Sequence, residues 1–191
     1  MDCLIIGASD RSILWRFGKI KEPAYPKFVK EYAEFLAKYF DNVIVNPDDG
    51  IYSDIAIEFG RLKGKKPIGY YPDKDTFYGI EHLKGSFSKF DLRPINGDWY
   101  KLDADLTKQA LCIISLGFSP GVLIEIGFIK YHQKYGSLKD PKLKNIHLFI
   151  DSRCIEQKLP KSFMEQIRNI FYFKSLKELG LLIEGKKELF K

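Results

Sequence analysis

The chain has 191 residues, of which 45% are hydrophobic, 15% aromatic and 29% charged. This length and composition allow one continuous buried core, which excludes general disorder and predicts a single domain over residues 1–191. The formal net charge is +6, but acidic residues are interspersed among the basic ones. A solvated mixed surface is therefore favoured over a nucleic-acid-binding surface, and we expect no nucleic-acid partner.

Cysteine usage and hydropathy bear on the cellular compartment. Cys3, Cys112 and Cys154 are odd in number and lack the spacing of metal ligands. Cys3 and Cys112 lie in apolar runs, where a free thiol behaves as a small hydrophobic side chain, and this indicates a reducing environment. No apolar stretch approaches the length of a membrane span, and no basic, apolar leader opens the chain. We expect a cytoplasmic protein with no membrane partner.

Short apolar runs alternate with amphipathic stretches along the first half of the chain. Two prolines precede the first amphipathic stretch, as is common at helix starts. Residues 71–94 show no regular pattern, and a loop of this length in a compact domain is often a lid or a binding loop. The predicted elements are, in chain order, strand 2–7, helix 28–40, strand 42–45, helix 52–63 and strand 67–70.

The second half continues the alternation. Its predicted elements are helix 102–109, strand 111–116, a helix ending near residue 135, strand 145–151, helix 162–168, strand 170–173 and a helix from residue 175. Strands that alternate with helices imply right-handed crossovers and parallel pairing. The predicted fold is α/β, a Rossmann-like three-layer fold with a mainly parallel central sheet flanked by helices.

Ligands of such folds bind at the loops that leave the carboxyl ends of the strands. The loop at 117–121 contains Ser119 and ends in Gly121, which lets the backbone approach a ligand at the start of the next helix. Glu125 lies about one turn into that helix, so its carboxylate could reach the same pocket. A structural role for Glu125, stabilised by the helix dipole, is an equal alternative.

Two further loops follow predicted strands. Asp48, Asp49 and Gly50 could bind ribose hydroxyls, as acidic residues at strand ends do in dinucleotide folds. A turn followed by a helix cap is the simpler explanation of the same three residues.

The loop after the first strand contains Gly7, Ser9, Asp10 and Arg11. Arg11 suits bidentate phosphate binding and equally suits a surface salt bridge. Neither a dinucleotide fingerprint nor a P-loop is present. The three histidines are scattered with no second ligand nearby, so we predict neither a metal site nor a cofactor.

Two segments resemble a known family. Residues 43–72 and residues 116–127 (LGFSPGVLIEIG) are similar to the "lonely guy", or lysine-decarboxylase-like, family of Rossmann-like nucleotide-binding proteins. Gly121 and Glu125 fall on the third glycine and the glutamate of its PGGxGTxxE signature. The Glu-Ile-Gly sequence that begins at Glu125 also resembles a sequence of the nucleoside deoxyribosyltransferases, in which the glutamate is the nucleophile.

The resemblance implies a homodimer, formed through the apolar helix 122–131, that binds a nucleoside monophosphate. It also implies hydrolysis of an N-glycosidic bond, with the Glu125 carboxylate stabilising or capturing the oxocarbenium-like sugar. The signature departs from the family at 117–119, which replaces Pro-Gly-Gly, and at Val122, which replaces threonine.

Three functional hypotheses follow, and the weakest is a nucleic-acid-associated protein, which the net charge of +6 motivates. In the first, the chain binds a nucleotide or sugar-phosphate ligand, with phosphate held by Ser9 and Arg11, and Glu125 acts at the glycosidic bond. In the second, the same pocket serves a nucleotide sensor that does not turn its ligand over.

Overall fold

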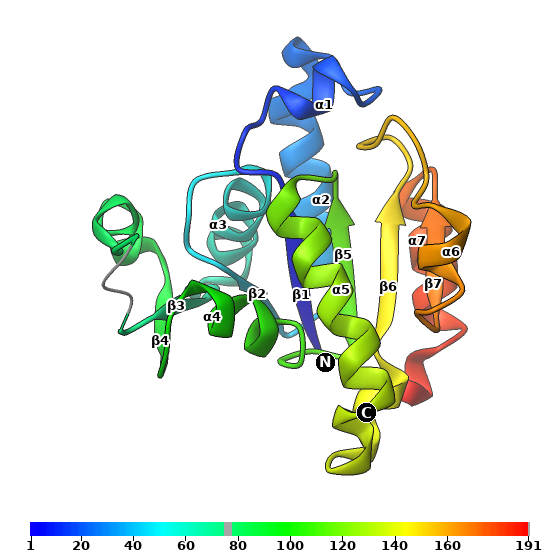
Figure 1. The fold of residues 1–191 in the computed structure, drawn as a ribbon. Helices are drawn as coiled ribbons and strands as arrows, with labels where there is room; N and C mark the ends of the chain where they lie inside the picture. The colour runs from blue at the N-terminus through cyan, green and yellow to red at the C-terminus, as the bar shows by residue number, and fades with distance from the viewer. Residues whose placement is uncertain (75–77, 191) are drawn as a thin grey trace.

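Parallel strands form one central sheet in the computed structural model, which describes residues 1–74 and 78–190 (Figure 1). Within that part of the chain the sheet has seven strands in the order β4-β3-β2-β1-β5-β6-β7, and every neighbouring pair is parallel. The strands are β1 (Asp2–Gly7), β2 (Asn42–Val45), β3 (Ile68–Pro72), β4 (Asp91–Ile95), β5 (Cys112–Leu116), β6 (His147–Asp151) and β7 (Ile170–Phe173).

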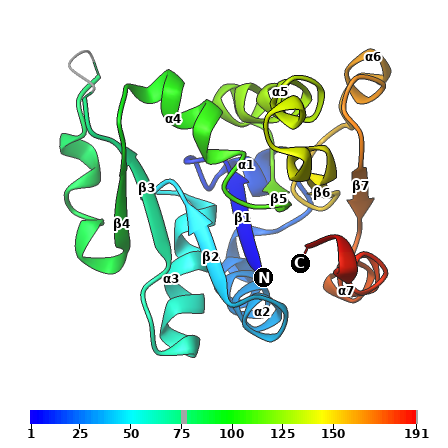
Figure 2. The same ribbon diagram turned by 90° about the horizontal axis from the view of Figure 1, so that it is seen from below.

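Helices cover both faces of the sheet. Figure 2 shows α4, α5 and α6 on one side of the strands and α2, α3 and α7 on the other. None of the helices in the described ranges is long and apolar enough to cross a membrane. The parallel sheet with helices on both faces confirms the predicted three-layer α/β fold. The helices are α1 (Ile13–Arg16), α2 (Tyr25–Tyr39), α3 (Ile51–Lys63), α4 (Trp99–Leu106), α5 (Pro120–Lys134), α6 (Lys161–Met164) and α7 (Leu176–Glu184).

Burial of the strands on both faces explains their apolar runs. Successive side chains of a strand point to opposite faces, so Cys3 and Ile5 of β1 pack into the layer under α2, α3 and α7. Leu4 and Ile6 pack into the layer under α4 and α5. All three cysteines are buried and free, as expected of small hydrophobic side chains.

Several segments differ from the prediction. The stretch 71–94, predicted to be irregular, contains most of β4, an edge strand in which Asp91, Arg93 and Pro94 are exposed. An edge strand tolerates proline and lacks a two-sided apolar pattern, so no periodicity marked it. Helix α4 begins at Trp99, three residues before the predicted start, because the Asp98 side chain accepts the Lys101 N–H at 2.9 Å as an N-cap. Helix α6 is a single turn that ends at Met164.

Strand order sets where the loops meet. The chain runs from β1 outward to β4 and then returns to pair β5 with β1, so the loops after β1 and β5 leave in opposite directions. A crevice forms at such a switch point, outside the carboxyl ends of the strands. The predicted loops at 7–11, 47–52 and 117–121 follow β1, β2 and β5 and lie around it.

Candidate functional site

A cavity of about 220 Å³ lies at this switch point, and we call it the carboxyl-end cavity. The loops after β1, β2 and β5 form its walls, together with the first turns of α3 and α5 and one side of α4. Six of the predicted site residues line it, from all three loops: Gly7, Ser9, Asp48, Ser119, Gly121 and Glu125.

Helix α5 positions Glu125. Ser119 is its N-cap, with Oγ accepting the Val122 N–H at 3.3 Å, and Pro120 occupies the first turn, where its missing N–H costs nothing. Glu125 therefore lies on the cavity side one turn further on, with only 8% of its surface exposed. No residue in the described ranges forms a hydrogen bond or ion pair with its carboxyl group that would offset this burial.

Asp103 of α4 lines the same cavity as Glu125. Burial, and the nearby charge of Asp103, raise the pKa of Glu125 well above its ordinary value. Burial raises the pKa of Asp103 to about 6. Both carboxyl groups therefore keep their protons to higher pH than an exposed acid does, and Glu125 is the more deeply buried of the two. Two neighbouring acids in different environments are the arrangement from which enzymes build a general acid and a general base.

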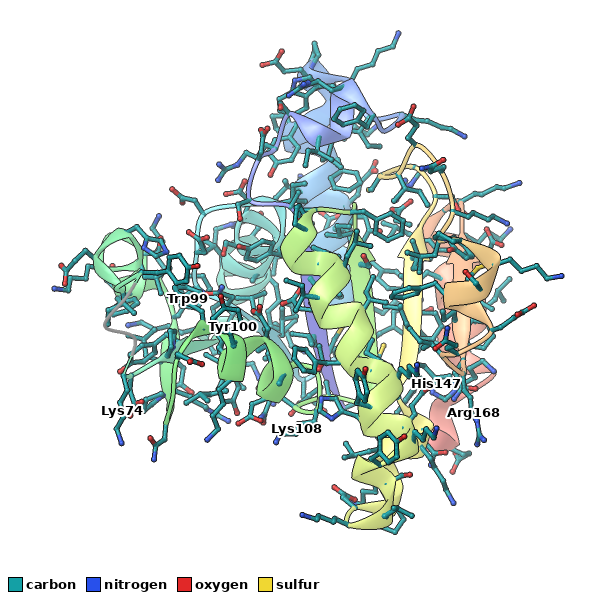
Figure 3. All side chains as sticks on the ribbon, in the orientation of Figure 1. Lys74, Trp99, Tyr100, Lys108, His147 and Arg168 are labelled. Carbon is teal, nitrogen blue, oxygen red and sulfur yellow. The ribbon has the colours of Figure 1, made fainter. Side chains whose placement is uncertain are left out.

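Beyond the aliphatic residues of the lining, the sequence prediction missed four polar or aromatic ones: Asn46, Tyr52, Trp99 and Asp103. Asn46 begins the loop that follows β2, and Tyr52 lies in the first turn of α3 just beyond it. Of that loop, only Asp48, Asp49 and Gly50 were predicted as site residues. Trp99 and Asp103 are one helical turn apart on α4, and the predicted start of that helix excluded Trp99. Figure 3 labels Trp99 and its neighbour Tyr100 at the beginning of α4.

Polar side chains line the side of the cavity formed by the β2–α3 loop and the start of α3. The Tyr52 hydroxyl lies 3.5 Å from Ser9 Oγ, and burial and the charge of Asp48 raise the pKa of Tyr52. Asp48 Oδ1 accepts the Asp49 N–H at 2.7 Å. The Asn46 Oδ1 atom is buried and has no hydrogen-bond partner among the described residues. A buried acceptor without a partner favours the binding of a ligand that donates a hydrogen bond to it.

Trp99 adds an aromatic wall. Its indole N–H donates to the Gly79 carbonyl oxygen at 3.1 Å, and the His82 ring stacks on it with ring centroids 5.5 Å apart. These contacts fix the orientation of the indole, which is half-buried at the cavity.

Four of the predicted residues do not line the cavity: Asp10, Arg11, Asp49 and Gly50. The Arg11 guanidinium forms a bidentate ion pair with Asp54 of α3, with Nε–Oδ2 at 2.5 Å and Nη2–Oδ1 at 2.8 Å. The Tyr25 hydroxyl donates to the same carboxylate at 2.5 Å. Of the two roles that the sequence leaves open for Arg11, this geometry shows the salt bridge.

Asp10 and Gly50 shape the loops. Asp10 accepts the Ser12 N–H at 2.9 Å and the Ser12 hydroxyl at 2.8 Å, and these bonds lower its pKa. Gly50 has φ +154°, and a Cβ there would lie 2.9 Å from both the Ala8 carbonyl oxygen and Ser9 Cα. Only glycine permits this close approach of the β2–α3 loop to the loop after β1.

The cavity is acidic. Its described lining includes Asp48, Asp103 and Glu125 and no lysine, arginine or histidine. In the described ranges no group of three or more histidine, cysteine or acidic residues could hold a metal ion.

A larger hollow, of about 790 Å³, lies at the opposite edge of the sheet, beside Asp2, Asp41 and Lys108. Ligands of open parallel sheets bind at the carboxyl ends of the strands, and this hollow is at the amino ends. Asp41 there is already paired with the N-terminal amino group. We therefore place the candidate site in the smaller carboxyl-end cavity, which contains buried polar groups without partners.

Comparison with known proteins supports the fold assignment. No protein-family model and no curated protein matches the sequence. The crystal structure of TM1055, a structural genomics target, superposes with a TM-score of 0.61 at 15% identity, over 96% of this chain and 98% of that one. The molybdenum cofactor binding protein from the phototrophic bacterium Rippkaea orientalis gives 0.60 at 12% identity, over 96% and 95%.

DNA processing protein A from Helicobacter pylori, described as binding single-stranded DNA, gives a TM-score of 0.56 at 15% identity, over 97% of this chain and 81% of that one. At 15% identity or less, these likenesses show that the chain shares its Rossmann-like fold with the three proteins. The resemblance seen in the sequence is thereby confirmed at the level of the fold.

Proposed function

We propose that the protein binds a nucleotide or a related sugar-containing ligand in the carboxyl-end cavity, and that Glu125 acts on its N-glycosidic bond. The observation that carries the proposal is the buried Glu125 carboxyl group, which faces a cavity at the switch point of the sheet and has no partner among the described residues. A buried acid of this kind, with a raised pKa, is typical of functional sites.

The different environments of Glu125 and Asp103 support different roles for the two acids in the reaction. Glu125, protonated, donates its proton to the ring nitrogen of the departing base, which keeps the electron pair of the broken carbon–nitrogen bond. The oxygen of a water molecule bonds to the anomeric carbon of the sugar, and its proton passes to the Asp103 carboxylate. This role differs from the one that the resemblance implies, in which an ionised glutamate captures the sugar.

Cavity size and lining agree with a ligand of this class. A cavity of about 220 Å³ is smaller than most drug-sized ligand sites, so it would enclose the sugar and leave the base toward its open side. The half-buried Trp99 indole lines the cavity, which places an aromatic side chain beside the base. Asn46 and Asp48 offer acceptors for sugar hydroxyls.

The neighbours point to ligand binding in general. One is a molybdenum cofactor binding protein, so a protein of the same fold binds a small molecule. Another binds single-stranded DNA, but an acidic cavity repels a polyphosphate backbone, so we do not extend that function to this chain.

The test is chromatography of products after incubation with nucleosides and nucleoside monophosphates. We expect free base, together with free sugar from a nucleoside or sugar phosphate from a monophosphate. We expect Glu125→Gln to lower kcat/KM at least about 100-fold, because the amide cannot donate the acid's proton. Glu34→Gln, on an exposed position of α2, is the matched control and should keep full activity. Turnover of Glu125→Gln at the parental rate would remove Glu125 from the mechanism.

A binding protein without turnover is the second candidate. The observation that favours it is the lack, among the described lining residues, of any cation to stabilise a departing group. Under this alternative every bound ligand is recovered intact from the wild-type protein.

A further inference from the structure

We propose that the carboxyl-end cavity selects nucleosides and rejects the corresponding nucleoside monophosphates. This inference rests on the proposed function, since it names the ligand class of the same site. It departs from the phosphate contact that the sequence predicted for Ser9 and Arg11.

Unpaired acceptors are the first reason. Asn46 Oδ1 is buried without a partner in the described chain, and among the described residues the Asp48 carboxylate accepts a hydrogen bond only from the N–H of its own neighbour, Asp49. Sugar hydroxyls and the amino groups of bases supply hydrogen-bond donors. In a monophosphate, an ionised phosphate replaces one of these hydroxyl groups. The phosphate supplies only acceptors, so it cannot donate a hydrogen bond to these oxygens.

The start of α5 is the second reason. Helix N-termini bind phosphate through free N–H groups. Here Pro120 has no N–H, the Val122 N–H donates to Ser119 Oγ at 3.3 Å, and the Leu123 N–H donates to the Ser119 carbonyl oxygen at 3.0 Å. Of this first turn, Gly121 keeps the one N–H for which the described residues show no acceptor. A single N–H is a poor phosphate site.

Charge is the third reason. Asp48 and Asp103 face the cavity, and the described lining contains no positive side chain to offset them. Arg11, the cation of the neighbouring loop, is held by both oxygens of Asp54 and by the Tyr25 hydroxyl bound to the same carboxylate. A phosphate in the cavity would meet two carboxylates at short range, and such like-charge contacts are unfavourable.

Calorimetric titration at neutral pH tests the inference. The titrants are the common ribonucleosides and deoxyribonucleosides and, for each, its monophosphate. We expect at least one nucleoside to bind, and to bind at least about tenfold more tightly than its monophosphate. Asp103→Asn should narrow this ratio by strengthening binding of the monophosphate, while Asp105→Asn, two residues further along α4 and absent from the cavity lining, should leave the ratio unchanged.

The outcomes separate the two claims. Equal or tighter binding of the monophosphate overturns the selectivity while leaving the proposed function intact. If neither class of ligand binds to wild-type protein whose thermal unfolding is cooperative, the proposed function fails and the inference fails with it. An unchanged ratio in Asp103→Asn contradicts the electrostatic argument.

Discussion

At the scale of single residues, burial is what gives Glu125 and Asp103 their chemistry. A carboxyl group on the surface would be ionised at neutral pH, whereas these two keep their protons to higher pH. The sequence placed Glu125 in the pocket through the spacing after Gly121. It could not show Asp103, because an acid on a charged helix looks the same in sequence whether it faces a cavity or solvent.

The raised pKa of Asp103 predicts how stability depends on pH. The folded state binds the Asp103 proton more tightly than the unfolded chain, whose ordinary value is 3.8, against about 6 when folded. Protonation therefore favours folding, and the free energy of unfolding should fall as pH rises from 3.8 to about 6.

Urea denaturation across this pH range measures the effect. Asp103→Asn cannot titrate, so the difference in unfolding free energy between variant and wild type should favour the variant increasingly toward pH 6. A difference that is constant with pH would show that Asp103 titrates alike in both states.

Gly121 offers a probe that acts on the ligand alone. A Cβ at Gly121 would meet no atom within 4 Å, and the same is true of Gly127 on the same helix. Replacing either glycine by alanine should leave stability unchanged or raise it by up to about 1 kcal/mol, through reduced backbone freedom.

Of these two glycines, Gly121 lines the carboxyl-end cavity and Gly127 does not. Gly121→Ala should therefore weaken ligand binding in a calorimetric titration, and Gly127→Ala should not. Equal affinities in the two variants would place the ligand away from the start of α5.

At the scale of elements, the Arg11–Asp54 ion pair ties the loop after β1 to α3, and the Tyr25 hydroxyl extends the cluster to α2. Arg11→Met removes the guanidinium and leaves Asp54 with the tyrosine as its partner. Because both side chains are partly exposed, we expect a loss of about 1 kcal/mol in chemical denaturation.

The same variant distinguishes the two roles of Arg11. With Arg11 in a structural pair, affinities for nucleosides and for monophosphates should change by the same small factor. A selective loss of monophosphate binding would show instead that Arg11 contacts phosphate.

Local pattern predicted the strands of the sheet interior and the edge strand β7, and it failed at the other edge of the sheet. Strands such as β1 and β5 are buried on both faces, so their apolar runs are plain in the sequence. Strand β4 has one neighbour and carries Asp91, Arg93 and Pro94 on exposed positions, which hide it. The three strand-end loops were predicted because their position follows from topology, whereas the contribution of α4 depends on tertiary packing.

At the scale of the whole molecule, the exposed apolar side of α5 bears on the predicted homodimer. Leu123, Ile124 and Tyr131 are 40%, 46% and 52% exposed. If this surface forms the dimer, Ile124→Lys should produce a monomer in light scattering coupled to size exclusion, without loss of thermal stability in the monomer fold.

Leu138→Lys, at a position just beyond the same helix that is 81% exposed, is the control for the added positive charge. A wild-type protein that elutes as a monomer at high concentration contradicts the prediction of a homodimer.

We propose the carboxyl-end cavity, and not the larger hollow at the amino ends of the strands, as the ligand site. Amide chemical shifts of isotopically labelled protein, followed during titration with the best-binding nucleoside, test it directly. The predicted result is a set of shifts centred on Gly7, Ser9, Gly121 and Val122. Shifts centred on Asp41, Lys108 and Leu143 at the opposite edge would contradict the account.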